Sequence, residues 1–77
     1  MSVASIAVIE SQKRSAQAEF LRWSKILEDT TKELEITAAE DPKRSYLVQF
    51  TEDCRVMVEH YKSIGDVQEK TLGNLRD

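Results

Sequence analysis

Apolar residues recur through the N-terminal half of the chain at spacings of three and four positions. The series consists of Ile6, Ile9, Lys13, Ala16, Phe20, Trp23, Leu27, Thr30 and Leu34. An α-helix has 3.6 residues per turn, so this series lies along one face of a helix. Most of its members are apolar, and the positions between them are rich in charged residues and good helix formers. The pattern predicts one helix from about Val3 to about Ala39.

A second series with the same spacing follows in the C-terminal half. Its members are Leu47, Phe50, Cys54, Met57, Tyr61, Ile64, Gln68, Thr71 and Leu75. Steps of seven from Leu34 would reach Val48 rather than Leu47, so the register changes between the two series. Asp41-Pro42 lies in this gap, and aspartate is a good N-cap while proline is favoured at the first position of a helix. A second helix is therefore predicted from about residue 42 to about residue 64.

Gly65 leaves two alternatives for the remainder of the chain. The second helix either continues through this glycine to about residue 75, or it stops there and a short third helix begins. The spacing of Asp66 and Glu69 resembles a capping box, which favours a restart. Both alternatives are compatible with the sequence.

Two helices of similar length joined by a short break favour an antiparallel hairpin. A single straight helix would expose both apolar series over more than about 110 Å. Folding at Asp41 makes a seam, the line of contact between the two series, with the layers Leu34–Leu47, Leu27–Cys54, Phe20–Tyr61, Lys13–Gln68 and Ile6–Leu75. The Lys13–Gln68 layer is polar, so we expect the end of the hairpin that holds both termini to be looser. The prediction is an all-α fold with residues 1–77 in a single domain.

Apolar residues also lie beside the seam, at Ile26, Tyr46, Val58, Val67 and Leu72. About two apolar positions in seven suffice for a two-helix seam, whereas helices of larger bundles have about three. A chain of 77 residues has a small core, and its single cysteine excludes an internal disulfide. We therefore expect a four-helix bundle, completed by dimerisation or by a partner protein.

The residues predicted to contact another protein lie on and beside the two series: Trp23, Ile26, Tyr46, Val58, Tyr61 and Val67. Tryptophan is enriched at the centres of protein interfaces, although on a seam it also serves as ordinary core. The alternative is that the additional apolar residues thicken the core of a monomer and leave Tyr46 and Val58 partly exposed.

Charge and composition disfavour several classes of partner. The chain has 11 basic and 14 acidic residues, a net charge of −3, and the two signs are interleaved along its length. No basic face for nucleic acid results from this pattern. The apolar run from Val3 to Ile9 is shorter than the about 20 residues that cross a bilayer, and it lacks the features of a signal peptide. With one lone cysteine, the expected location is the cytoplasm.

The sequence contains no recognisable catalytic, cofactor or metal motif. Cys54 and His60 are six residues apart, so on a helix they do not share a face. The residue three positions before His60 is Met57, whereas di-iron bundles use glutamate there. Gly65 and Gly73 occur singly, without a phosphate-binding loop. We therefore predict no catalytic residue, no cofactor and no metal ligand.

These observations together predict a non-enzymatic protein-interaction module. The leading hypothesis is a helical-hairpin adaptor or assembly protein that forms a homodimer and engages an unidentified protein. The alternative is a small inhibitor or co-chaperone that masks a surface of its partner. With its turn from Asp41-Pro42 to Tyr46, the layout is similar in size and architecture to the helical-hairpin co-chaperones of bacterial type III secretion systems. Small phage-encoded inhibitors of host proteins are also helical chains of this length.

Overall fold

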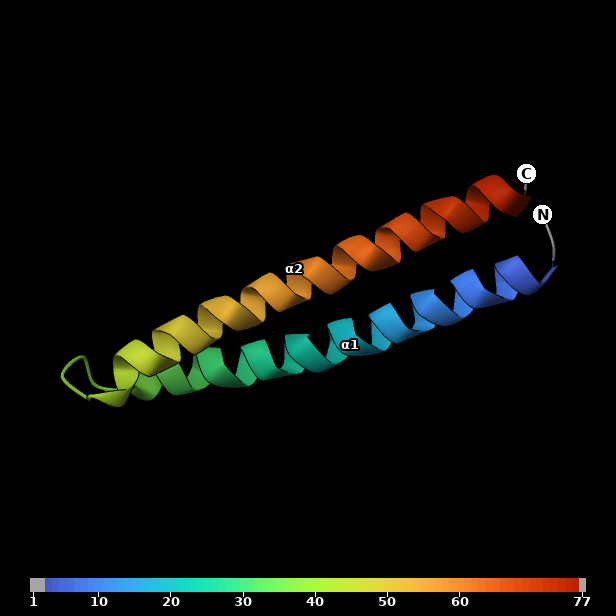
Figure 1. Cartoon of the computed structure of the whole chain (residues 1–77). Helices are drawn as coiled ribbons and strands as arrows, with labels where there is room; N and C mark the ends of the chain where they lie inside the picture. The colour runs from blue at the N-terminus through green and yellow to red at the C-terminus, as the bar shows by residue number, and fades with distance from the viewer. Residues whose placement is uncertain (1–2, 77) are drawn as a thin grey trace.

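Two long helices packed side by side make up the computed structural model, which describes residues 3–76 (Figure 1). Helix α1 spans Val3–Ile36 and helix α2 spans Lys43–Arg76, with no strand between residues 3 and 76. The chain reverses between them, so both ends of the described chain lie at one end of the rod. The predicted all-α antiparallel hairpin is confirmed. Helix α2 is continuous through Gly65, so no third helix forms.

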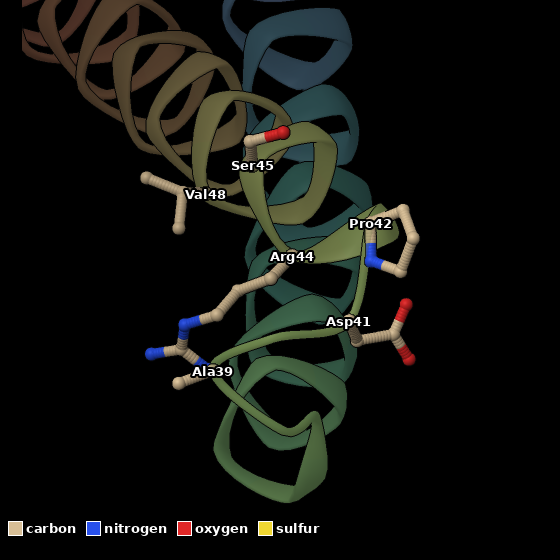
Figure 2. Close-up of a pocket in the computed structure, with 6 residues that line it drawn as sticks. All are labelled: Ala39, Asp41, Pro42, Arg44, Ser45 and Val48. Carbon is tan, nitrogen blue, oxygen red and sulfur yellow. The ribbon is translucent and has the colours of Figure 1, made fainter.

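Two side chains stabilise the turn between the helices: Asp41 bonds the start of α2, and Arg44 bonds the end of α1. The Asp41 carboxylate Oδ1 accepts a hydrogen bond from the Lys43 backbone N–H at 3.0 Å, which is the expected N-cap of α2. The Arg44 guanidinium Nη1 donates to the carbonyl oxygens of Leu34 at 3.2 Å and Thr37 at 2.8 Å. Helix ends leave such carbonyls without helical partners, and a cation is favourable there. Figure 2 shows the Asp41 and Arg44 side chains pointing to opposite sides of the turn.

Helix α1 ends at Ile36, three residues before the predicted limit at Ala39. The Thr37 N–H donates to the Leu34 carbonyl at 3.2 Å, which is a tightened last turn. The Ala38 carbonyl then accepts from the Asp41 N–H at 3.0 Å, within the reversal of the chain. Ala38 and Ala39 follow Ile36, and alanine has the highest helix propensity. Local propensity therefore favours a longer helix than the one that forms. Helix α1 ends earlier because the chain has to reverse its direction before Asp41, which caps α2.

The core between the helices is narrow and consists mostly of small residues. Within the described chain the buried residues are Ala16, Thr30, Leu47, Thr51, Cys54 and Leu72. Every predicted seam residue is buried or half-buried, so the register of both helices is as predicted. Helix α2 is, however, rotated so that Thr51 and Leu72, beside the seam, face α1 more closely than Phe50 and Met57 do. Leu72, predicted to flank the seam, is 1% exposed.

The helices stay in contact beyond the polar layer near the termini. Lys13 forms an ion pair with Glu69, and the Gln68 amide Nε2 donates to Gln12 Oε1 at 3.0 Å. Farther along, the buried Leu72 still packs against α1. The two helices therefore do not separate at this end, and its looser packing stays a prediction. The lysine stem lies along the seam while its ammonium group reaches a carboxylate at the edge.

The molecule is a rod rather than a compact domain. Its Cα atoms extend over 58 × 14 × 13 Å, and their radius of gyration is 17.3 Å. A compact domain of this length would have a radius of gyration of about 11 Å. Neither helix of the described chain is long and apolar enough to cross a membrane. Two helices of this length bury only one narrow strip of each other, so large apolar side chains remain at the surface.

Candidate protein-binding surface

Two interhelix ion pairs define one side of the hairpin, which we call the ion-paired side. Lys13 of α1 pairs with Glu69 of α2, and Arg76 of α2 pairs with Glu10 of α1. The hydrogen bond from Lys13, and then its positive charge, lowers the pKa of the Glu69 carboxyl from its ordinary value. Two charge pairs on this side of the hairpin therefore link the two helices.

The opposite flank of α2 carries a stripe of larger apolar and aromatic residues. At spacings of three and four, the stripe consists of Tyr46, Phe50, Asp53, Met57, His60, Ile64 and Val67. Tyr46 is 69% exposed and Val67 is 63% exposed, whereas Phe50, Met57 and Ile64 are half-buried. The Tyr46 and Phe50 rings are stacked, with their centroids 6.2 Å apart. Helix α2 thus presents to solvent an apolar edge that Asp53 and His60 interrupt.

Helix α1 contributes Trp23 and Ile26 on the same side of the seam, and both are half-buried. The Trp23 indole Nε1 donates to Glu19 Oε2 at 3.2 Å, and the Arg22 guanidinium carbon lies 5.2 Å from the indole centroid. The polar atom of Trp23 is therefore satisfied within its own helix, and Arg22 covers one part of the ring. We call this flank of the hairpin the apolar side, made of Ile9, Trp23, Ile26, Ile36, Tyr46, Phe50, Val56, Met57, Ile64 and Val67.

The six residues predicted for the interface do not all lie together. Trp23, Ile26, Tyr46 and Val67 are on the apolar side. Val58 is half-buried on the flank of α2 that also holds Thr51 and Leu72, toward the ion-paired side. Tyr61 is half-buried in the seam, and its ring meets the edge of the His60 ring with centroids 5.1 Å apart.

Several residues of the apolar side were assigned to the seam or overlooked in the sequence. Phe50, Met57 and Ile64 belong to the predicted seam, and only the rotation of α2 leaves them half-exposed. Ile36 is 86% exposed and Val56 is 55% exposed. Both lie outside the two regular series, so periodicity gave no signal for them. Their position beside the stripe becomes visible only when the two helices are packed.

Two shallow hollows lie on the apolar side, both in the half of the rod near the termini. One is lined on α2 by His60, Ser63, Ile64, Val67 and Gln68. The other is lined on α1 by Ala4, Ser5, Val8 and Ile9. Each is formed by a single helix and is open to solvent, so each suits a protruding side chain of another protein better than a small substrate.

A third hollow lies at the turn and is lined by Ala39, Asp41, Pro42, Arg44, Ser45 and Val48 (Figure 2). Its two charged residues already have structural roles. Asp41 caps α2, and Arg44 binds the last carbonyls of α1. Both charged residues of this hollow therefore serve to stabilise the turn.

The titratable groups of the described chain do not converge on a reactive centre. Cys54 is fully buried, and this burial raises the pKa of its thiol, while the neighbouring Thr30 hydroxyl acts in the opposite direction. A buried, protonated thiol is a weak nucleophile. No group of three or more histidine, cysteine, aspartate or glutamate side chains within residues 3–76 is arranged to hold a metal ion.

In comparisons with known proteins, no family model matches the chain, and neither a curated protein nor a solved structure matches it. The fold defines the class of the protein, which is an all-α antiparallel helical hairpin.

Proposed function

We propose that the protein is a non-enzymatic protein-interaction module, a helical-hairpin adaptor or assembly protein that acts as a homodimer in the cytoplasm. The observation that carries the proposal is the apolar side. Tyr46, Val67 and Ile36 are mostly exposed there, and a row of half-buried residues joins them. Contiguous exposed apolar surface with polar edges is typical of protein interaction sites.

The energetics of a two-helix rod support this proposal. Removing apolar surface from water contributes about 25 cal/mol per Å². A hairpin with only six buried residues in its described part gains little of this energy on its own. Packing a second hairpin on the apolar side would bury Phe50, Met57 and Ile64 and produce the four-helix bundle that the sequence pattern favours.

A second candidate function uses the same surface with a different partner. An inhibitor or co-chaperone would accept one amphipathic helix of another protein along the apolar side. The exposed stacked pair Tyr46 and Phe50 favours this possibility as well, because aromatic residues are enriched at interface centres. The two candidates differ in whether the purified protein associates with itself.

The test compares exposed apolar residues on the two sides of the hairpin. Tyr46→Ser with Val67→Ser removes apolar contact from the apolar side without touching a buried residue. Leu21→Ser with Val48→Ser is the matched control, because these residues are 67% and 50% exposed but lie on the ion-paired side. Light scattering measures the mass over a concentration series, and circular dichroism measures the helicity of the same samples.

We expect a dimeric wild-type protein, a largely monomeric Tyr46/Val67 variant and a dimeric control. A wild-type protein that stays monomeric contradicts the homodimer. If such a monomer captures a protein partner through Tyr46 and Val67, the second candidate holds. If both double variants behave like the wild type, the apolar side is not the interaction surface.

A further inference from the structure

We infer that the occupant of the apolar side is a second copy in antiparallel orientation, with the turn of each hairpin against the termini of the other. This inference rests on the proposed homodimer and adds its orientation. The twofold axis then crosses the rod near His60, at the middle of Lys43–Arg76. Helix α2 of one copy lies on α2 of the other, and the two α1 helices pair in the same way.

The first argument is the distribution of charge along the apolar side. Toward the turn, the exposed charged residues at its edges are the acidic Glu33 and Asp53 and the basic Lys43, so two negative charges face one positive charge in this half. Toward the termini, the exposed Lys70 makes no ion pair with residues 3–76. A dimer with both turns at one end would bring the acidic residues of the two copies together. The antiparallel dimer instead places the acidic half of each copy on the half with Lys70, so the charges are complementary.

The register supports this pairing of charges. With the twofold axis near the middle of α2, Lys70 of one copy lies opposite Phe50 of the other. Asp53 is three residues, less than one helical turn, from Phe50. An antiparallel copy therefore brings Lys70 to within about 5 Å along the axis of the partner subunit's Asp53. Within one chain the two residues are about 25 Å apart along α2. Any interaction between Lys70 and Asp53 must then be between copies.

The second argument is the shape of the apolar side. Among the residues of the apolar side, the two most exposed, Ile36 and Tyr46, lie in the half near the turn. Both hollows lie in the other half, around Ala4–Ile9 on α1 and around His60–Gln68 on α2. Antiparallel stacking puts Ile36 of one copy at the level of the Ala4–Ile9 hollow of the other. It also puts Val56 and Met57 at the level of the His60–Gln68 hollow, so protruding residues meet hollows rather than one another.

Cross-linking tests the orientation directly. In a Cys54→Ala background, single cysteines are introduced by His60→Cys, near the proposed axis, and by Gln49→Cys, toward the turn. A short bifunctional thiol reagent should link His60→Cys to itself rapidly, whereas Gln49→Cys should not self-link, because its two copies would be about 30 Å apart along the axis. A dimer in which Gln49→Cys self-links as fast as His60→Cys overturns the antiparallel orientation and leaves the homodimer standing.

Charge exchange provides an independent test by sedimentation equilibrium at low salt. Lys70→Glu should weaken dimerisation by about threefold, and Lys70→Glu combined with Asp53→Lys should restore it. Lys62→Glu is the matched control, since Lys62 is exposed on the ion-paired side and should leave the dissociation constant unchanged. Equal effects of Lys70→Glu and Lys62→Glu, with no restoration in the double variant, overturn the inference. A wild-type protein that is monomeric under all conditions overturns the proposed homodimer with it.

Discussion

Thr51 is 5% exposed, and its hydroxyl oxygen has no hydrogen-bond partner in residues 3–76. The other buried threonine, Thr30, donates its hydroxyl to the Leu27 carbonyl at 3.1 Å. A buried polar group without a partner costs about 1 to 3 kcal/mol. The sequence marked Thr30 as a seam member, but only the rotation of α2 brought Thr51 into the core.

Replacing Thr51 by valine should therefore stabilise the fold. The valine side chain has nearly the same shape and removes the unpaired hydroxyl, so Thr51→Val should raise the free energy of unfolding by about 1 kcal/mol. Chemical denaturation followed by circular dichroism measures this change. Thr30→Val is the control and should give less stabilisation, because it removes a hydroxyl that has a partner. Equal gains at both positions would contradict the argument.

The buried thiol of Cys54 should make the stability of the fold decrease at alkaline pH. Burial raises the pKa of the folded thiol above its ordinary value of 9.0, so the unfolded chain loses this proton first as the pH rises. The contribution of Cys54 is thus fully present below pH 9.0 and is lost as the pH rises above it. The free energy of unfolding should fall more steeply above pH 9.0 in the wild type than in Cys54→Ala. Parallel pH profiles would show that the thiol does not ionise on unfolding.

At the scale of the helices, Gly65 is the clearest departure from local preference. It lies in the interior of α2, and a Cβ added there would have no atom within 4 Å. Glycine in a helix interior is less favourable than alanine by about 1 kcal/mol. The sequence left a stop at this glycine open because local signals alone do not include the packing of residues 66–76 on α1. Leu72 and the Glu10–Arg76 pair hold that segment in place.

Gly65→Ala should accordingly stabilise α2 without changing its association. We expect the free energy of unfolding to rise by about 1 kcal/mol, measured by thermal and chemical denaturation. Gly73→Ala should give a smaller gain, because Gly73 lies in the last turn of α2, where helices fray. Since Gly65 lies away from the apolar side, the mass in solution should stay that of the wild type. A loss of stability at Gly65 would show that the helices need a closer approach there.

The sequence predicted the start of α2 correctly, because a capping residue marks it. Asp41 and Pro42 mark the start of α2 in the sequence, and the Asp41 carboxylate caps it as expected. The end of α1 had no such marker. The Arg44 side chain binds the last carbonyls from the next helix, a contact between residues 7 to 10 positions apart that helix propensity does not contain.

At the scale of the whole molecule, the length of the rod makes association the main route to additional stability. A radius of gyration of 17.3 Å reflects two helices that contact each other along one strip only. Association of folded chains stabilises them by mass action, so the melting temperature becomes concentration-dependent. We expect the melting temperature of the wild type to rise with protein concentration and that of the Tyr46→Ser/Val67→Ser variant to stay constant. Differential scanning calorimetry over a hundredfold concentration range measures both, and a concentration-independent wild type would contradict the homodimer.

The sequence by itself determined the two helices, their seam register, the turn at Asp41-Pro42 and the antiparallel pairing. These features follow from the period of apolar residues and from capping, which are local properties of the chain. The tertiary structure alone decided the rotation of α2, which buries Thr51 and Leu72 and leaves Phe50, Met57 and Ile64 at the surface. It also separated Val58 from Trp23, Ile26, Tyr46 and Val67. Periodicity identifies a broad apolar face, but the part of that face which is covered depends on how closely small residues such as Ala16, Thr30 and Cys54 let the helices approach.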